Sequence, residues 1–144
     1  MAATSPEARI LDALLTALTG LALDPPLPLA LPGIGYSPVT GKPYLAASYL
    51  PNTSRLDGLA FDGDRTHIGL FVVTVVWSAG GGLVKPLDVA ARVRRAFAAG
   101  TRLEGDPVTV CIDESPEVGA PLDDGPWLRV PVTIRWRVGV SAAA

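Results

Sequence analysis

The sequence predicts an α+β fold, in which a mostly antiparallel β-sheet of about four to five strands carries two α-helices packed on it. From Leu128 to Val138 every even-numbered residue is apolar and every odd-numbered one is Arg, Pro or Thr. This period of two is typical of a half-buried strand and cannot form the stripe of a helix. Residues 68–77 form a nearly continuous apolar run, and residues 5–20 and 86–99 carry apolar stripes at helical spacing.

The composition indicates one domain over residues 1–144, long enough to bury a core. Hydrophobic residues make up 49% of the chain and charged residues 18%, against about 25% charged residues in an ordinary domain. So few charges favour a protein that hides surface against partner subunits, although an Ala-rich composition set by a GC-rich genome gives the same figures. The net charge of -2 gives no overall reason to expect specific nucleic-acid binding.

Several other classes are excluded. Cys111 is the only cysteine, which rules out an internal disulfide and a cysteine-based metal cage. The longest apolar run, over residues 68–77, has about half the length that a membrane-spanning helix needs. The first residues lack the basic start and the clear cleavage site of a signal peptide, and Asp12 interrupts their apolar stretch. We therefore expect neither secretion nor membrane insertion.

The first predicted element is a helix within residues 1–22. Ser5 can cap its N-terminus, Pro6 suits its first turn, and Glu7 suits the positive end of the helix dipole. Gly20 is the expected stop.

Residues 23–43 are predicted to form an extended arm or long loop, because recurring prolines and glycines exclude a helix there. A short strand at residues 29–31 is the one regular element expected in this segment. A structureless segment of this length is unusual inside a compact domain. We therefore expect the arm to pack on a neighbouring subunit or to act as a functional loop.

The core is predicted over residues 44–138. The run at residues 67–77 suits a central strand covered on both faces, and Asp88 can pair with Arg92 one helical turn later. In chain order the core elements are a strand over 44–50, a polar loop over 51–66, a strand over 67–77, a glycine-rich turn at 80–82, a helix over 86–99, a strand over 107–112, an acidic loop over 113–126 and a final strand over 127–138.

No residue cluster predicts a catalytic site. His67 is the only histidine and Cys111 the only thiol, so a nucleophilic site of the usual kind would need His67. Cys111 falls inside a predicted strand, where a buried cysteine behaves as a small hydrophobic residue.

Metal and phosphate sites are also not expected. The carboxylates at residues 62–64 and 113–117 match no calcium-loop spacing, and we interpret them as solvated loop charges. The glycines at residues 80–82 precede Lys85, but Pro86 follows where a phosphate loop needs a hydroxyl residue. The sequence thus predicts no cofactor.

Five segments together resemble the small phage tail terminator-like proteins, which include the lambda tail terminator-like family. The resemblance covers residues 43–138 and consists of structural motifs. The matching segments are Tyr49-Leu50-Pro51-Asn52, the strand at 67–76, Gly80-Gly81-Gly82-Leu83, the helix end at 97–103 and the last strand at 127–136.

The resemblance implies a structural virion protein and no enzyme activity. Its members are expected to form a homohexameric ring at the head-proximal end of the tail tube, assembled in the host cytoplasm. The ring would stop tail polymerisation and offer the surface for head-tail joining. The implied partners are further copies of the chain, the tail tube protein and the head-tail connector or neck protein, with DNA passing through the lumen without specific binding.

The candidate subunit and tube contacts are the polar residues of the predicted loops and the arginines of the second helix and last strand. The arginines could touch phosphates, pair with the acidic loops of an adjacent subunit or simply form solvated faces, and the net acidic chain favours the last two. The candidates are Asn52, Arg55, Asp57, Asp62, Asp64, Arg92, Arg95, Arg129, Arg135 and Arg137.

Three other hypotheses stay open at this point. The protein could be a head-completion or neck ring on the other side of the same joint, or a tail-tube subunit that polymerises end on end. It could also be a small α+β ligand-binding domain or enzyme, whose pocket would be built around His67 and Cys111.

Overall fold

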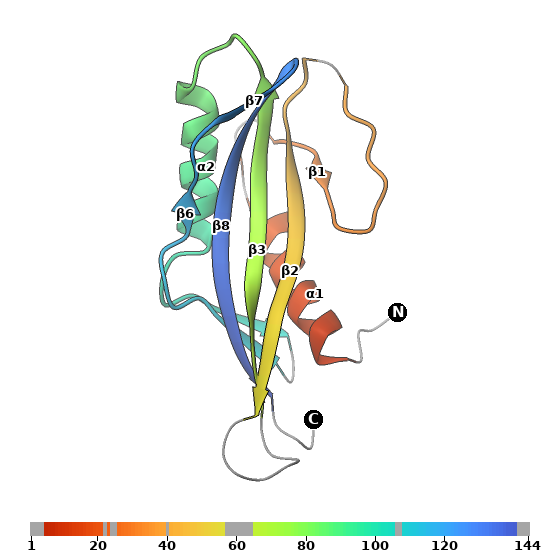
Figure 1. Cartoon of the computed structure of the whole chain (residues 1–144), viewed down its shortest axis with the longest axis vertical. Coiled ribbons are helices and arrows are strands. Elements are labelled where there is room, and N and C mark those ends of the chain that lie inside the picture. Colours follow the sequence, from red (N-terminus) through yellow and green to blue (C-terminus); the bar gives the residue numbers. More distant parts are fainter. Residues whose placement is uncertain are drawn as a thin grey trace.

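The computed structural model describes residues 5–21, 23, 26–39, 41–56, 65–105 and 108–140. Two helices pack behind one face of a tall, curled β-sheet (Figure 1). The elements, in chain order, are α1 (Pro6–Thr19), β1 (Leu29–Ala30), β2 (Tyr44–Leu56), β3 (Arg65–Ser78), α2 (Val84–Ala96), β4 (Arg102–Gly105), β5 (Val108–Cys111), β6 (Glu117–Val118), β7 (Leu122–Asp124) and β8 (Trp127–Val140).

The sheet is organised around three long antiparallel strands, β2, β3 and β8. Its strand order is β1-β2-β3-β8-β5-β4, and β6 and β7 also pair with β8. The segment from β5 to β7 therefore runs along the edge of β8 that β3 leaves free. The β7–β8 hairpin turns at Gly125, whose φ of 59° lies in the left-handed region.

The α+β class and the two helices are confirmed, but the predicted sheet is too small. Among the described residues the sheet has eight strands, and it is mixed, because β1 pairs with β2 in parallel. The prediction missed β4, β6 and β7, which are two to four residues long. Such short strands show no readable period and form because the edges of β5 and β8 offer unpaired backbone groups.

The polar loop predicted over residues 51–66 is wrong in extent. β2 continues to Leu56 and β3 already begins at Arg65, with the register shifting between Pro51 and Thr53. Backbone pairing does not depend on side-chain polarity, and a β-bulge accommodates the missing N–H of Pro51. Residues 57–64 lie outside the described part of the chain.

Both helices begin close to where the sequence predicts them. The Ser5 side chain accepts a hydrogen bond from the Ala8 N–H at 3.1 Å, and Gly20 follows the last residue of α1. The second helix starts two residues before Pro86 and ends at Ala96, three residues before the predicted end. Proline fits there because the first helical turn needs no N–H donor from it.

Replacing Ser5 with alanine is expected to lower the free energy of unfolding by about 1 kcal/mol, because the capping hydrogen bond to the Ala8 N–H is lost. Urea denaturation followed by circular dichroism measures the change. Ser5→Asp, which keeps an acceptor, is the control and should retain wild-type stability. Equal losses in both variants would contradict a capping role.

The hydrophobic core lies between the helices and the sheet face turned toward them. Ile10 and Leu14 of α1 and Val93 of α2 are fully buried there. The sheet contributes alternate residues, odd-numbered in β3 and even-numbered in β8, as the period of two predicts. We call the opposite side of the sheet the outer face.

Tyr49 lies at the helix-facing side of β2 and stacks on Trp136, with 5.7 Å between ring centroids. Its hydroxyl donates a hydrogen bond to the backbone carbonyl of Glu7 at 3.3 Å. Burial, followed by the negative charge of Glu7, raises the pKa of Tyr49 to about 12. Tyr49 therefore ties β8 to the first turn of α1 as a neutral phenol.

Alkaline pH is expected to weaken the fold through Tyr49. The pKa of Tyr49 is about 12 in the folded protein, whereas that of an unfolded tyrosine is about 10. The stabilisation that Tyr49 gives to the folded state is therefore complete below pH 10 and is lost as the pH rises toward 12. Tyr49 is only half-buried, so the slope should stay below about 1.4 kcal/mol per pH unit. Tyr49→Phe should show a shallower fall in unfolding free energy over this range, and an unchanged slope would refute the assignment.

Neither helix, and no other helical stretch within the described residues, has both the length and the apolar character required to cross a bilayer.

Candidate functional site

The structure separates the two residues around which a catalytic pocket could have formed. His67 pairs with Val138 across the β3–β8 ladder, and Val138 is buried on the helix side. Cys111 pairs with Arg137, which lies on the outer face. Since opposite residues of a ladder share a face, His67 and Cys111 point to opposite sides of the sheet. This geometry argues against a nucleophilic site built from this pair.

Metal binding finds no support in the part of the chain that the structure describes. No group of three or more His, Cys, Asp and Glu side chains there is placed to hold an ion.

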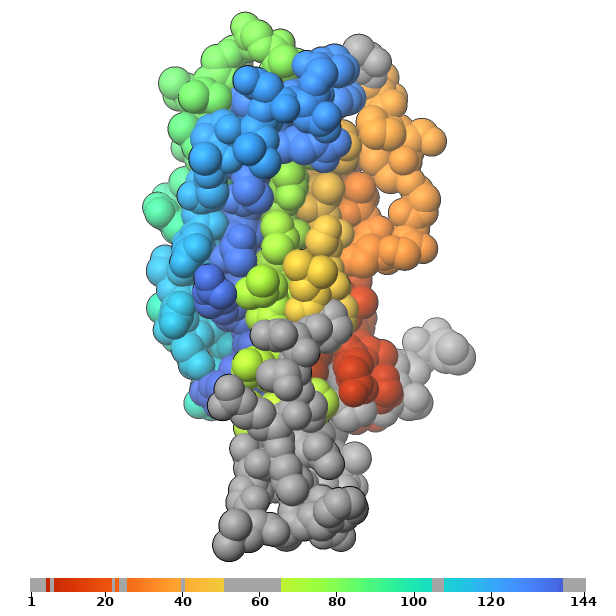
Figure 2. Space-filling view, viewed as in Figure 1, coloured from red at the N-terminus to blue at the C-terminus, as the bar shows by residue number. Residues whose placement is uncertain are grey.

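A candidate contact surface lies on the outer face of the sheet. Figure 2 shows β8, β3 and β2 side by side at the surface, between the segment that carries β6 and β7 and the arm. A shallow hollow of about 220 Å³ lies on this face. It is lined by Ile68, Gly69, Leu70, Asp113, Glu114, Arg135, Trp136 and Arg137.

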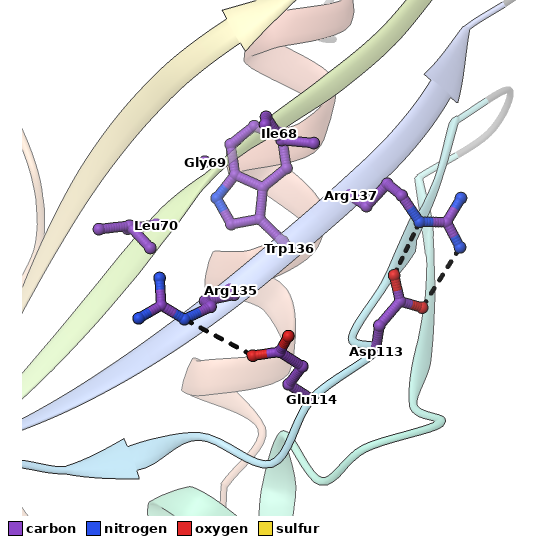
Figure 3. A pocket seen from close by; sticks show the side chains of 8 residues that line it. All are labelled: Ile68, Gly69, Leu70, Asp113, Glu114, Arg135, Trp136 and Arg137. Atoms are coloured by element: carbon purple, nitrogen blue, oxygen red, sulfur yellow. Dashed lines mark hydrogen bonds and ion pairs between the residues drawn. The ribbon is translucent and has the colours of Figure 1, made fainter.

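Ion pairs border this hollow, as Figure 3 shows. The Nε of Arg137 donates to Asp113 at 2.7 Å, and its Nη2 donates to the other carboxylate oxygen at 3.2 Å. Arg135 lies 3.7 Å from Glu114 and 3.6 Å from Glu117. The hydrogen bond from Arg137 holds the pKa of Asp113 below its usual range. Both arginines are therefore oriented by carboxylates of the segment that runs along the edge of β8.

A third arginine of β8 forms an ion pair at the far end of the same strand. The Nε of Arg129 donates to Asp124 at 2.7 Å, and this hydrogen bond raises the pKa of Arg129. We call residues 113–124 the acidic strip. All three outward arginines of β8 thus have partners in the acidic strip of their own chain. Because these pairs are exposed, each contributes no more than about 1 kcal/mol to stability.

The remaining candidate contact residues fall in other places. Arg92 lies 3.7 Å from Asp88 on α2, as the spacing predicts, and Arg95 is exposed in the last turn of the same helix. Asn52 and Arg55 lie in the extension of β2 and not in a loop. Asp57, Asp62 and Asp64 lie outside the described residues. The structure therefore gathers Arg129, Arg135 and Arg137 on one surface and places Arg92 and Arg95 on a helix behind the sheet.

Sequence reasoning missed the apolar side chains of the outer face. Ile68, Leu70 and Val72 of β3 are only half-buried, and Leu50 of β2 is 50% exposed. The expectation that both faces of β3 are covered is therefore wrong for these residues within one chain. The sequence did contain a signal for this surface. The even-numbered residues of the apolar run are apolar as well as the odd-numbered ones, and a strand with a single buried face needs only one of these two sets.

The arm is partly anchored on its own sheet. Tyr36 packs against Tyr44 with 4.8 Å between ring centroids, and Tyr44 meets the edge of Trp127 at 5.8 Å. The predicted short strand in the arm is confirmed as β1. Ile34 and Val39 nevertheless remain 63% and 54% exposed, so the arm also presents apolar surface to solvent.

Comparison with known proteins places this architecture. No curated protein matches the chain. A solved structure matches with a TM-score of 0.69 and 23% sequence identity, over 88% of this chain and 94% of its own. That likeness concerns the fold alone. The model of a family described as phage tail terminator protein matches residues 9–136. The chain, a structural component of a phage tail, therefore belongs to the phage tail terminator family.

Proposed function

We propose that the protein forms a hexameric ring at the head-proximal end of a phage tail tube. There the ring stops tail polymerisation and provides the surface to which the head connector binds. The observation that carries this proposal is the match to the terminator family over residues 9–136. It spans most of α1, all of α2 and almost all of the sheet.

The proposed mechanism is geometric. A closed ring uses one heterologous contact repeated around its axis, so that each subunit offers two different surfaces to its two neighbours. One side of the ring would match the last tube ring, and the other side would offer no further tube-binding edge. Growth then stops because the next tube subunit finds no complementary surface.

All the candidate residues are proposed as contacts to neighbours or to the tube: the five arginines of α2 and β8, Asn52 and Arg55 of β2, and Asp57, Asp62 and Asp64. Arg92 and Arg95 lie on α2, and Arg129, Arg135 and Arg137 lie on the outer face. Because each outer-face arginine already has a carboxylate partner, contact with a neighbour there would extend existing ion pairs. This role is consistent with an exposed, oriented charge network.

Electron microscopy of the protein mixed with its tail tubes tests the proposal. A single extra ring at the head-proximal tube end, with no growth beyond it, is the expected result. Bare tube ends with the protein bound to DNA-filled heads would instead establish a neck protein. Long filaments from the pure protein would establish a tube subunit, and either result would overturn the terminator function.

A further inference from the structure

Part of the outer face of the sheet lacks the covering layer that its sequence anticipates, although Val76, opposite Tyr44, is fully buried there. On the helix side of β3, Phe71, Val73 and Val75 are fully buried. On the outer side, Ile68, Leu70 and Val72 are equally apolar, yet only half-buried. A strand that is apolar on both faces is typical of sheets covered on both sides. Apolar surface of this kind, bordered by charged groups, marks an interaction site.

Helix α2 presents a stripe that could supply this layer. Its solvent side begins with apolar side chains, because Val84 is 83% and Leu87 38% exposed. One and two turns further along the same side lie Ala91 and then Arg94 and Arg95, both exposed. The stripe is therefore apolar in its first half and cationic at its end.

The two surfaces have complementary charge. The helix α2 carries four cationic side chains, Lys85, Arg92, Arg94 and Arg95, and a single carboxylate, Asp88. The acidic strip carries five carboxylates, against three arginines that β8 directs toward it. The positively charged C-terminal end of α2 would therefore be attracted to the acidic strip at the border of the outer face. This attraction fixes the direction in which the helix lies on that face.

The placement of the two surfaces suits a repeating contact. The outer face lies at the front of the sheet and α2 lies behind it (Figure 1). One copy can therefore give its α2 to a neighbour while its own outer face accepts the α2 of another copy. Such a contact is heterologous and generates a ring when the rotation closes.

We propose that the occupant of the outer face is α2 of a second copy of this chain. Val84 and Leu87 lie over Leu70 and the neighbouring apolar side chains, and Arg94 and Arg95 face the acidic strip of that neighbour. This inference rests on the proposed ring and names the contact that builds it.

Two glutamate substitutions test the two halves of the contact. Val84→Glu places a charge in the α2 stripe at a position so exposed that folding is not disturbed, and a carboxylate suits the start of a helix. Leu70→Glu places a charge on the accepting face. The matched control is Ala8→Glu, which adds the same charge to the exposed first turn of α1.

The variants are measured by sedimentation velocity alone and by electron microscopy with tail tubes. Wild-type protein and Ala8→Glu are expected to form the ring, in solution or at the tube end, whereas Val84→Glu and Leu70→Glu lose it. Thermal unfolding should show that Val84→Glu is as stable as the wild type in its monomeric form. A Val84→Glu protein that still forms the wild-type ring overturns the inference.

Mixing the two defective variants gives a sharper result. Val84→Glu keeps an intact outer face and Leu70→Glu keeps an intact α2, so an equal mixture can form one good contact. The expected product is a one-to-one heterodimer that grows no further, although each variant alone is monomeric. A mixture that stays monomeric, or that rebuilds full rings, contradicts the head-to-tail contact.

The outcomes also separate this contact from the proposed function. Wild-type rings that leave tube ends bare would overturn the terminator function and leave the contact standing. Rings of Val84→Glu that cap tubes as well as the wild type would overturn the contact alone. The absence of any wild-type oligomer, both in solution and at tube ends, would overturn both.

Discussion

Replacing Phe71 with alanine is expected to lower the free energy of unfolding by about 3–5 kcal/mol. Phe71 is fully buried at the centre of β3, and its ring centroid lies 6.0 Å from that of Phe97. The substitution loses the transfer free energy of the ring and leaves a cavity between the sheet and the end of α2. Neighbouring strands pair on both sides of β3 and prevent the site from collapsing. Urea denaturation of both proteins measures the difference.

The control for this prediction is an apolar residue outside the core. Val39→Ala in the arm, where the side chain is 54% exposed, should change the unfolding free energy by less than about 0.5 kcal/mol. A double-mutant cycle with Phe97→Ala should give a coupling energy of at least about 0.5 kcal/mol, because the two rings are in contact. A loss below about 1 kcal/mol for Phe71→Ala would show that this core is not packed as described.

Features that depend on a local pattern could be predicted from the sequence. The last strand was predictable because eleven residues alternate without interruption, and β8 runs from Trp127 to Val140. The start of α1 was predictable because a cap and the first turn are set by Ser5 and its immediate neighbours. The Asp88–Arg92 pair follows from the helical repeat alone.

Features that depend on distant parts of the chain could not be predicted. β6 consists of Glu117 and Val118. These two residues form a strand because they pair with the free edge of β8, and not because of an intrinsic β-propensity. The partner of Arg137 is Asp113, twenty-four positions away, and the choice is fixed only by the path of the acidic strip. The sequence predicted an outward row of arginines on β8, but it could not show that this row is already paired.

The exposure of the outer face also depends on parts that lie outside a local sequence pattern. The continuous apolar run of β3 predicted a strand covered on both faces, and a single chain covers one face fully and the other only near Val76. If α2 of a neighbour supplies the second cover, the prediction described the assembled ring correctly and the isolated subunit incorrectly. An apolar pattern can also arise from a surface that becomes buried between subunits, because the fully buried centre of such an interface is more apolar than the rest of the surface.

Gly69 lies in β3 between the outer face and the core. Its replacement is expected to cause the second large loss of unfolding free energy. A Cβ atom at this position would lie 2.5 Å from Cζ2 of Trp136 and 2.7 Å from the backbone oxygen of Leu50. The first contact involves a ring that is 3% exposed and stacked on Tyr49, and the second involves backbone of the adjacent strand. Neither neighbour can move freely, so Gly69→Ala should cost about 3 kcal/mol of unfolding free energy.

Trp136→Phe is the companion variant that identifies the source of this cost. The smaller ring removes atoms near the added methyl group and also removes the indole Nε1, which is buried without a hydrogen-bond partner among the described residues. In the double variant the damage should be smaller than the sum of the two single losses, by about 1 kcal/mol. Strict additivity would mean that the contact with the Leu50 carbonyl dominates. A Gly69→Ala protein as stable as the wild type would mean that β2 and β8 are not held as closely against β3 as the structure has them.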